Sequence, residues 1–301
     1  MPAMPATGSP ESSSPVSVDL QIIDSDIKDL GGFSVRRVLP AAARQMVGPF
    51  IFFDHFGPTQ FAPGEGVQVR PHPHIGLATV TYLFEGEIIH RDSLGYVQAI
   101  QAEAVNLMTA GRGIVHSERA GDDLHRVSQL HGLQAWMALP QALEDCEPDF
   151  SHYPANSLPE FDQDGVSIRV IMGEVFGHES PVTQHAPTLY LECHCPAETM
   201  LTLPNNYDEV AAYVVAGEIR VSGSVVTEGQ MVVAAPGEAL CLQATLDSHV
   251  MIVGGARFGE RHIWWNYVSS SEQRIEQAKL DWRNNRFAAV PGETEFIPLP
   301  E

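Results

Sequence analysis

Two short histidine motifs are the residues of this chain whose types and spacing could do chemistry. One is His72-Pro73-His74, and the other is His116-Ser117-Glu118. In an extended strand, residues i and i+2 point to the same face, so each motif presents two polar side chains together. If the two strands lie side by side, three imidazoles and one carboxylate converge on one point. Such a set suits a borderline divalent transition metal, and iron is a natural candidate.

The alternative is that these are two unrelated pairs, because the chain holds 13 histidines. An HxH pair alone is weak evidence, but its combination with HxE and with the glycines that frame both motifs favours a metal site. We therefore predict that His72, His74, His116 and Glu118 bind one ion, and softness and geometry permit Fe, Mn, Co, Ni or Cu. No HxH or HxE pair occurs in residues 160–260, so we expect no metal there.

This ligand set predicts oxygen chemistry on an aromatic substrate. Four protein ligands leave up to two positions open on a six-coordinate ion, enough for an ionised substrate hydroxyl and dioxygen. Glu118 is the candidate catalytic carboxylate, because it could take up a proton while it ligates. Apolar residues near the motifs could wall a pocket, although at least half of them should belong to ordinary core. They are Phe52, Phe53, Phe56, Phe61 and Met108.

The elements that must position these residues read as many short strands at turn-marked intervals. Such a pattern predicts an all-β protein built as a barrel or sandwich. Glycine turns recur at matching places in the two halves, so we predict a diverged tandem repeat, that is, two barrels of one plan. The expected strands are residues 18–22, 33–38, 79–84, 105–108 and 133–139 in the first half, then 166–172, 189–194, 210–215, 231–234 and 250–253.

The same pattern divides the chain into three parts. Residues 1–17 are rich in Pro, Ser and Ala and should be disordered. Residues 18–145 should form the metal-binding barrel, and residues 146–301 a second barrel without metal. The second part should include an amphipathic helix at about 270–285 that docks on a barrel, with Ser269 as its N-cap and Glu272 at position N3.

Composition narrows the partners. The formal net charge of −21 repels phosphate backbones and anionic membranes, so we expect no direct binding to nucleic acid or membrane. We find neither the basic and apolar regions of a signal peptide nor an apolar run near the ~20 residues that cross a bilayer. Four cysteines give no disulfide framework. We expect a cytoplasmic monomer.

Several motifs resemble those of one protein family. Residues 66–74, a glycine followed by the HxH pair, and residues 109–116 resemble the two motifs of the cupin superfamily. Residues 71–76 (PHPHIG), 108–118 (MTAGRGIVHSE) and 132–136 (GLQAW) resemble the pirin family more narrowly, and residues 262–266 (HIWWN) its bacterial branch. The resemblance extends over nearly the whole chain from about residue 18.

The resemblance implies a bicupin whose N-terminal barrel alone binds metal, usually Fe(II), through His72, His74, His116 and Glu118. It also implies quercetin 2,3-dioxygenase activity, the oxidative opening of the flavonol C ring with release of carbon monoxide. Eukaryotic members are described as nuclear transcription cofactors. One departure is Ala78, which stands where typical cupins place a glutamate, so any acid, base or substrate-orienting role of that carboxylate is lost.

We therefore expect an all-β bicupin with a C-terminal helix that acts as a metal-dependent dioxygenase on a flavonol-like substrate and dioxygen. The alternative is a metal or redox sensor that acts through a protein partner without turnover. An apolar pocket that reaches the ion would favour the enzyme. A plugged ion with an exposed apolar patch elsewhere would favour the sensor.

Overall fold

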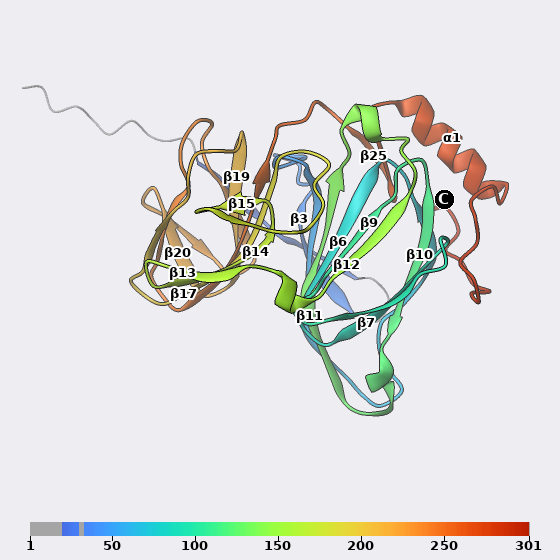
Figure 1. Cartoon of the computed structure of the whole chain (residues 1–301), viewed down its shortest axis with the longest axis horizontal. Helices are drawn as coiled ribbons and strands as arrows, with labels where there is room; N and C mark the ends of the chain where they lie inside the picture. The colour runs from blue at the N-terminus through green and yellow to red at the C-terminus, as the bar shows by residue number, and fades with distance from the viewer. Residues whose placement is uncertain (1–19, 30–32, 301) are drawn as a thin grey trace, which may run out of the picture.

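The chain folds into two β-barrels side by side, with a helix on the outer side of the first barrel (Figure 1). The computed structural model describes residues 20–29 and 33–300. The predicted disorder of residues 1–17 lies outside the described residues. Among those described, strands dominate and there is one α-helix, α1 (Glu272–Arg283). The all-β, two-barrel prediction is confirmed.

The first barrel pairs a large sheet with a small one. Its central strands, such as residues 50–56 and 77–83, are buried almost without interruption, which is the pattern of strands packed on both faces. The large sheet has the order β12 (Asp149–Tyr153), β9 (Val105–Thr109), β6 (Leu77–Glu85), β11 (Ser128–Ala138), β4 (Phe50–Phe61), β3 (Ser34–Leu39) and β2 (Asp26–Asp29). The small sheet has the order β5 (Gln68–His74), β10 (Ile114–Ala120), β7 (Glu87–Asp92) and β8 (Val97–Gln101).

The second barrel repeats this plan. Its strands follow one another in the sheets in the equivalent order, which bears out the predicted tandem repeat. The large sheet runs β1 (Gln21–Asp24), β22 (Gln230–Val233), β19 (Glu209–Ala216), β24 (Ser248–Gly255), β17 (Thr188–Cys195), β14 (Val166–Met172) and β13 (Glu160–Gln163). The small sheet runs β18 (Met200–Thr202), β23 (Cys241–Ala244), β20 (Glu218–Val221) and β21 (Ser224–Thr227).

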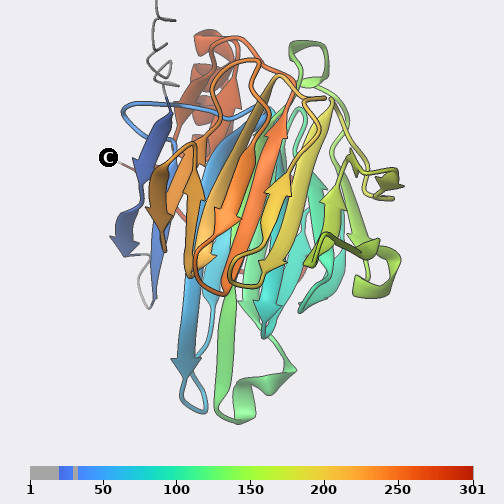
Figure 2. The same cartoon turned by 90° about the vertical axis from the view of Figure 1, so that its left-hand side faces the viewer.

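The two large sheets pack face to face, and Figure 2 shows the sheet of the second barrel in front of the first barrel. We call the buried layer between them the inter-barrel core. It contains Phe53, Ala78 and Tyr82 from the first barrel and Tyr190 and Tyr213 from the second. Strand β1 comes from the N-terminal part of the chain but pairs with β22, so the barrels also exchange a strand.

Short elements complete the chain. The hairpins are β15 (Glu174–Val175) with β16 (His178–Glu179) and β25 (His262–Trp264) with β26 (Tyr267–Ser269). The described residues also form 3-10 turns at η1 (Asp122–His125), η2 (Gln141–Leu143) and η3 (Ala155–Ser157). Helix α1 buries Ile275 and Ala278 against Ile75 and Tyr267, beside the first barrel. No helix in the described part of the chain is long and apolar enough to cross a membrane.

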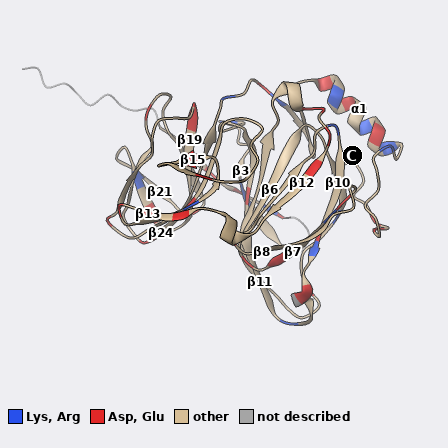
Figure 3. Cartoon of the chain, viewed as in Figure 1, with Lys and Arg blue, Asp and Glu red and all other residues tan. Residues whose placement is uncertain are grey.

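The predicted cap of the helix was placed two residues too early. The N-cap is Ser271, whose hydroxyl accepts the Arg274 amide at 3.4 Å. Ser269 and Ser270 instead donate to the buried carboxylate of Glu144. On α1, Lys and Arg alternate with Asp and Glu, as Figure 3 shows.

Candidate metal centre

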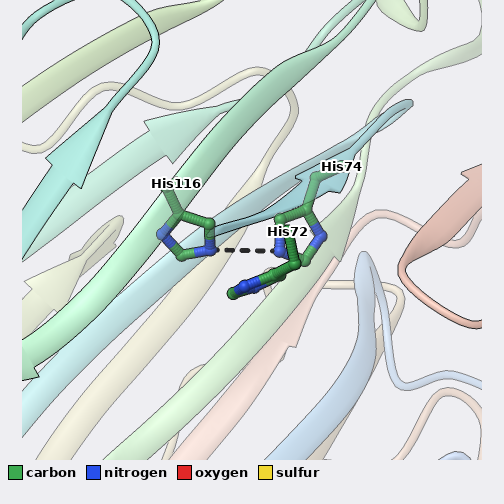
Figure 4. A group of neighbouring side chains, drawn as sticks. All are labelled: His72, His74 and His116. Atoms are coloured by element: carbon green, nitrogen blue, oxygen red, sulfur yellow. Dashed lines mark hydrogen bonds between the residues drawn. The ribbon is translucent and has the colours of Figure 1, made fainter. Parts of the chain in front are cut away.

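Three imidazoles meet on the inner face of the small sheet of the first barrel. His72 and His74 come from β5 and His116 from β10, and antiparallel pairing sets His116 opposite His72 and Ile114 opposite His74. Their ligand nitrogens all lie within 4.8 Å of one another, and all three residues are buried. Figure 4 shows the rings turned toward one another, with the Nε2 atoms of His74 and His116 3.1 Å apart. The predicted convergence of these three residues is observed.

Backbone carbonyls fix which nitrogen of each β5 histidine is free. His72 Nδ1 lies 2.9 Å from the Arg70 carbonyl, and His74 Nδ1 lies 3.1 Å from the Asn266 carbonyl. A carbonyl oxygen only accepts, so each Nδ1 must carry the proton and donate it. In the neutral ring, the Nε2 atom then presents a bare lone pair to the centre. This is the tautomer that a metal requires.

His116 is set by a pair of residues on the neighbouring strand β7. Asp92 accepts a hydrogen bond from His90 Nε2 at 2.9 Å, so His90 Nδ1 is left as an acceptor. That nitrogen faces His116 Nδ1 at 3.4 Å. His116 therefore donates through Nδ1 and presents a bare Nε2, as the other two histidines do. Asp92 is itself held by the amides of Leu94 and Tyr96.

Burial keeps these rings neutral. It lowers the pKa of His72 to about 4 and holds the pKa values of His74 and His116 well below the usual value for histidine. Metal–nitrogen bonds of about 2.0–2.1 Å place two ligands on one ion roughly 3.0–3.4 Å apart. The 3.1 Å separation of His74 and His116 fits this range. Three converging lone pairs in a buried site thus fit one divalent transition metal.

Local irregularities in the backbone supply the two carbonyls. Between the His116–His72 pair and the Glu118–Val69 pair, β5 has one more residue than β10, which makes a bulge at Arg70. The other carbonyl comes from the tight turn of the β25–β26 hairpin, where Trp265 adopts a left-handed φ of 53° beside Asn266. The HIWWN stretch therefore carries the group that orients His74.

Glu118 faces the same cavity from β10, but it is not a member of the compact histidine group. Burial raises the pKa of Glu118 to about 7, and a cation nearby would favour its ionised form. Its part in metal binding stays a prediction.

The three histidines line one part of a cavity of about 400 Å³. Phe52 and Trp136 stack on its wall with ring centroids 3.9 Å apart, and Trp136 makes a T-shaped contact with His74. Arg37 lies over Phe52 and binds Asp54 through two hydrogen bonds of 2.8 Å. Its remaining nitrogen is not used by that pair. The cavity thus combines flat aromatic walls with an Arg37–Asp54 ion pair, a volume and character typical of small-molecule sites.

Sequence reasoning identified this wall only in part. All five proposed apolar residues lie in hydrophobic clusters, and two of them, Phe52 and Phe56, also line the cavity. The expectation that at least half would be core is therefore confirmed. Sequence reasoning missed the lining residues Phe33, Trp136, Trp265, Arg37 and Asn266, and the pair behind His116, His90 and Asp92. The pair has the same i,i+2 spacing as the ligands, and that was the available signal.

Ala78 does not face the cavity. It is fully buried in the inter-barrel core and lies opposite Met137 on β11 and Thr109 on β9. A carboxylate on this Cβ would point toward the second barrel. The missing glutamate therefore removes no group from the cavity of this chain.

Known proteins share this architecture. Residues 32–137 match the family profile described as Pirin, and residues 190–288 match that of the Pirin C-terminal cupin domain. A pirin-like protein of Caulobacter vibrioides is 48% identical over 289 residues, which cover 94% of this chain and 100% of the relative. A Pseudomonas aeruginosa protein described as a candidate quercetin 2,3-dioxygenase is 39% identical over 277 residues, 89% of this chain and 86% of the relative. A crystal structure of quercetin 2,3-dioxygenase from Acinetobacter baumannii has a TM-score of 0.87 and 34% identity, and covers 94% of this chain and 95% of that one.

Proposed function

Because the chain belongs to the pirin family, we propose that it is a metal-dependent dioxygenase of the quercetin 2,3-dioxygenase type. The substrate is a flavonol-like aromatic, whose central ring is opened by dioxygen with release of carbon monoxide. The observation that carries the proposal is the set of three bare Nε2 atoms at the inner end of an aromatic cavity. Relatives named for this activity support it.

His72, His74 and His116 would hold the ion, and Glu118 would be its fourth ligand. We take Fe(II) as the ion, with Mn, Co, Ni and Cu as the alternatives to be tested. A bound divalent cation lowers the pKa of a substrate hydroxyl and fixes its orientation. Glu118, which a bound cation would hold in its ionised form, would accept the proton of that hydroxyl.

The cavity walls orient the substrate. Trp136, which stacks on Phe52, offers its flat ring to an aromatic ring system. Gln134 is held by the Thr81 hydroxyl, which donates to its side-chain oxygen at 2.8 Å, so its amide nitrogen is free to donate into the cavity. Arg37 Nη1, the nitrogen that Asp54 does not bind, would donate a hydrogen bond to a substrate oxygen. These contacts position the ring and exclude water from it.

The cavity also supports one of the two functions that the sequence leaves open. A sensor without turnover needs no space beside its ion, whereas this histidine group adjoins a cavity large enough for a small molecule. The enzyme is therefore the function that the geometry favours.

The test is oxygen uptake and carbon monoxide release with quercetin, using protein loaded in turn with Fe(II), Mn(II), Co(II) and Ni(II). We expect turnover by the wild type and background rates for His72→Ala. His125→Ala, which changes an exposed histidine that hydrogen-bonds the Asp122 carbonyl, is the matched control and should match the wild type. Glu118→Gln should lose turnover more severely than bound metal. Equal background rates in wild type and His72→Ala with every ion would remove the proposal.

A further inference from the structure

A second group of metal-ligand side chains lies outside the cavity, where the two barrels meet. Glu192 and His194 come from β17 and His249 from β24, and pairing sets His194 directly opposite His249. Neighbouring β17 residues Leu191 and Cys193 point into the core of the second barrel. Since side chains alternate along a strand, Glu192 and His194 point the other way, toward the first barrel.

The three ligand atoms are spaced as ligands of one ion. Glu192 Oε1 lies 2.9 Å from His249 Nε2 and 3.5 Å from His194 Nε2, and all three atoms lie within 4.8 Å of one another. Two ligands on one ion are separated by roughly 3.0–3.4 Å. The His194 ring stacks on that of His249 with centroids 4.4 Å apart, and because the His194 side chain is 60% exposed it can turn its Nε2 lone pair toward the common point.

The surroundings carry an excess of negative charge. Arg169 is the cation beside Glu192, and its guanidinium also contacts Glu103 and Glu160. One positive charge therefore faces three carboxylates. A shallow groove of about 500 Å³ opens over the two histidines, and two further carboxylates, of Asp162 and Asp247, line it. A divalent cation in this place would reduce the excess charge, and the groove gives it a route from solvent.

We propose that Glu192, His194 and His249 form a second binding site, open to solvent, for a borderline divalent metal such as Zn²⁺ or Ni²⁺. Two imidazoles and one carboxylate suit these ions and leave positions for water. The site differs from the first in position, because it lies on the outer face of its barrel and not inside. The sequence predicts no metal in the second barrel. It does not reveal this group, because His249 comes next to Glu192 and His194 only when β24 pairs with β17.

An ion here would hold the barrels together. The Tyr82 hydroxyl of the first barrel donates to Glu192 Oε2 at 2.5 Å, and the Phe84 ring lies 4.5 Å from that of His249. Two of the three ligands thus already contact the first barrel. Because binding to the folded state alone stabilises it, the ion should raise the melting temperature of the whole chain.

The test is a calorimetric titration of metal-free protein with Zn²⁺ alone. We expect two ions per wild-type chain, and one in each of the double variants His72→Ala/His116→Ala and His194→Gln/His249→Gln. In the first of these variants, Zn²⁺ should raise the melting temperature. Adding His194→Gln to it should weaken binding by more than the roughly 10–100-fold that loss of an outer partner costs.

The exposed His194→Gln change keeps the test valid if the double variant at 194 and 249 does not fold. His125→Gln is the matched control for binding to surface histidines and should leave the stoichiometry at two. A single ion in wild type and none in His72→Ala/His116→Ala would overturn the proposal, as would a second ion that survives in His194→Gln. Because the His72→Ala/His116→Ala protein lacks the first site, this outcome is separate from failure of the proposed dioxygenase.

Discussion

Asp92 should control metal affinity without touching the metal, and Asp92→Asn tests this with almost no change of shape. In the wild type, Asp92 accepts the His90 Nε2 proton, and His90 Nδ1 accepts the proton of His116. The asparagine side chain of the variant would keep an oxygen for the Leu94 and Tyr96 amides but offer an NH2 group to His90. His90 must then carry its proton on Nδ1, which forces the proton of His116 onto Nε2. The lone pair that faces the ion is lost.

The magnitude follows from what the variant must break to bind metal. To restore the lone pair of His116 Nε2, the variant must give up one buried hydrogen bond of the Asp92–His90–His116 series, worth about 0.5–1.5 kcal/mol. The series also loses the charged acceptor that Asp92 provides. A total of about 1.4–2.7 kcal/mol corresponds to a 10–100-fold weaker Kd, which is the usual effect of changing a partner behind a metal ligand. The tertiary structure and the cavity should be unaffected.

The assay is a competition titration with Zn²⁺ in the His194→Gln background, so that the second group of ligands does not contribute. Nitrogen NMR of the imidazoles reports the tautomers directly and should show His116 protonated at Nδ1 in wild type and at Nε2 in Asp92→Asn. Asp149→Asn, at an exposed aspartate, is the control. Once His90→Phe has removed the intermediate ring, Asp92→Asn should have little further effect. An Asp92→Asn protein with wild-type affinity and unchanged tautomers would refute the reasoning.

Three further results are expected. Burial lowers the pKa of His55 to about 3. The unfolded chain therefore takes up a proton between pH 6.5 and 4 that the folded chain does not, and the free energy of unfolding falls by up to about 1.4 kcal/mol per pH unit. Denaturant titrations should show a shallower fall for His55→Asn, and equal slopes would contradict this. Glu293 binds Arg119 and Ser117 on β10, and its hydrogen bond from Arg119 holds its pKa below the usual value of 4.5. This stability is present above pH 4.5 and is lost as pH falls through the lowered pKa. Glu293→Gln should accelerate proteolysis of the C-terminal segment at neutral pH more than the exposed Glu295→Gln, and equal rates would argue against the contact. Ala78→Glu should lower the melting temperature sharply or prevent folding, since an unpaired carboxylate in the inter-barrel core costs several kcal/mol. A stable variant with faster quercetin turnover would show that this residue faces the cavity after all.

The sequence was sufficient for the parts of the site that depend on local periodicity. His72 and His74 share a face because they are two residues apart on one strand, and this holds wherever the strand lies. Joining them to His116 required only that β5 and β10 be neighbours, as they are. The helix was predictable for the same reason, since its apolar spacing is local.

The rest depended on contacts between segments that are distant in the chain. His90 and Asp92 are recognisable only once β7 is known to pair with β10. The Asn266 carbonyl reaches His74 because a hairpin far along the chain packs on β5. The predicted N-cap at Ser269 was wrong because the Ser269 hydroxyl donates to Glu144, a residue distant in sequence, and does not cap the helix. No periodicity within a single segment contains this information.

The large sheet of the first barrel has two buried faces. One face lines the cavity, and the other packs against the second barrel. On β4, Phe52 and Asp54 face the cavity, while Phe53 and His55 face the second barrel. On β11, Gln134 and Trp136 alternate with Leu133, Ala135 and Met137 in the same way. A slip of one residue in either strand would exchange the two sets, so the apolar residues of the inter-barrel core also fix which side chains the cavity receives. Substitutions in these strands should therefore fall into two classes. Changes at even-numbered positions should alter ligand binding in the cavity, and changes at odd-numbered positions should alter the packing of one barrel on the other.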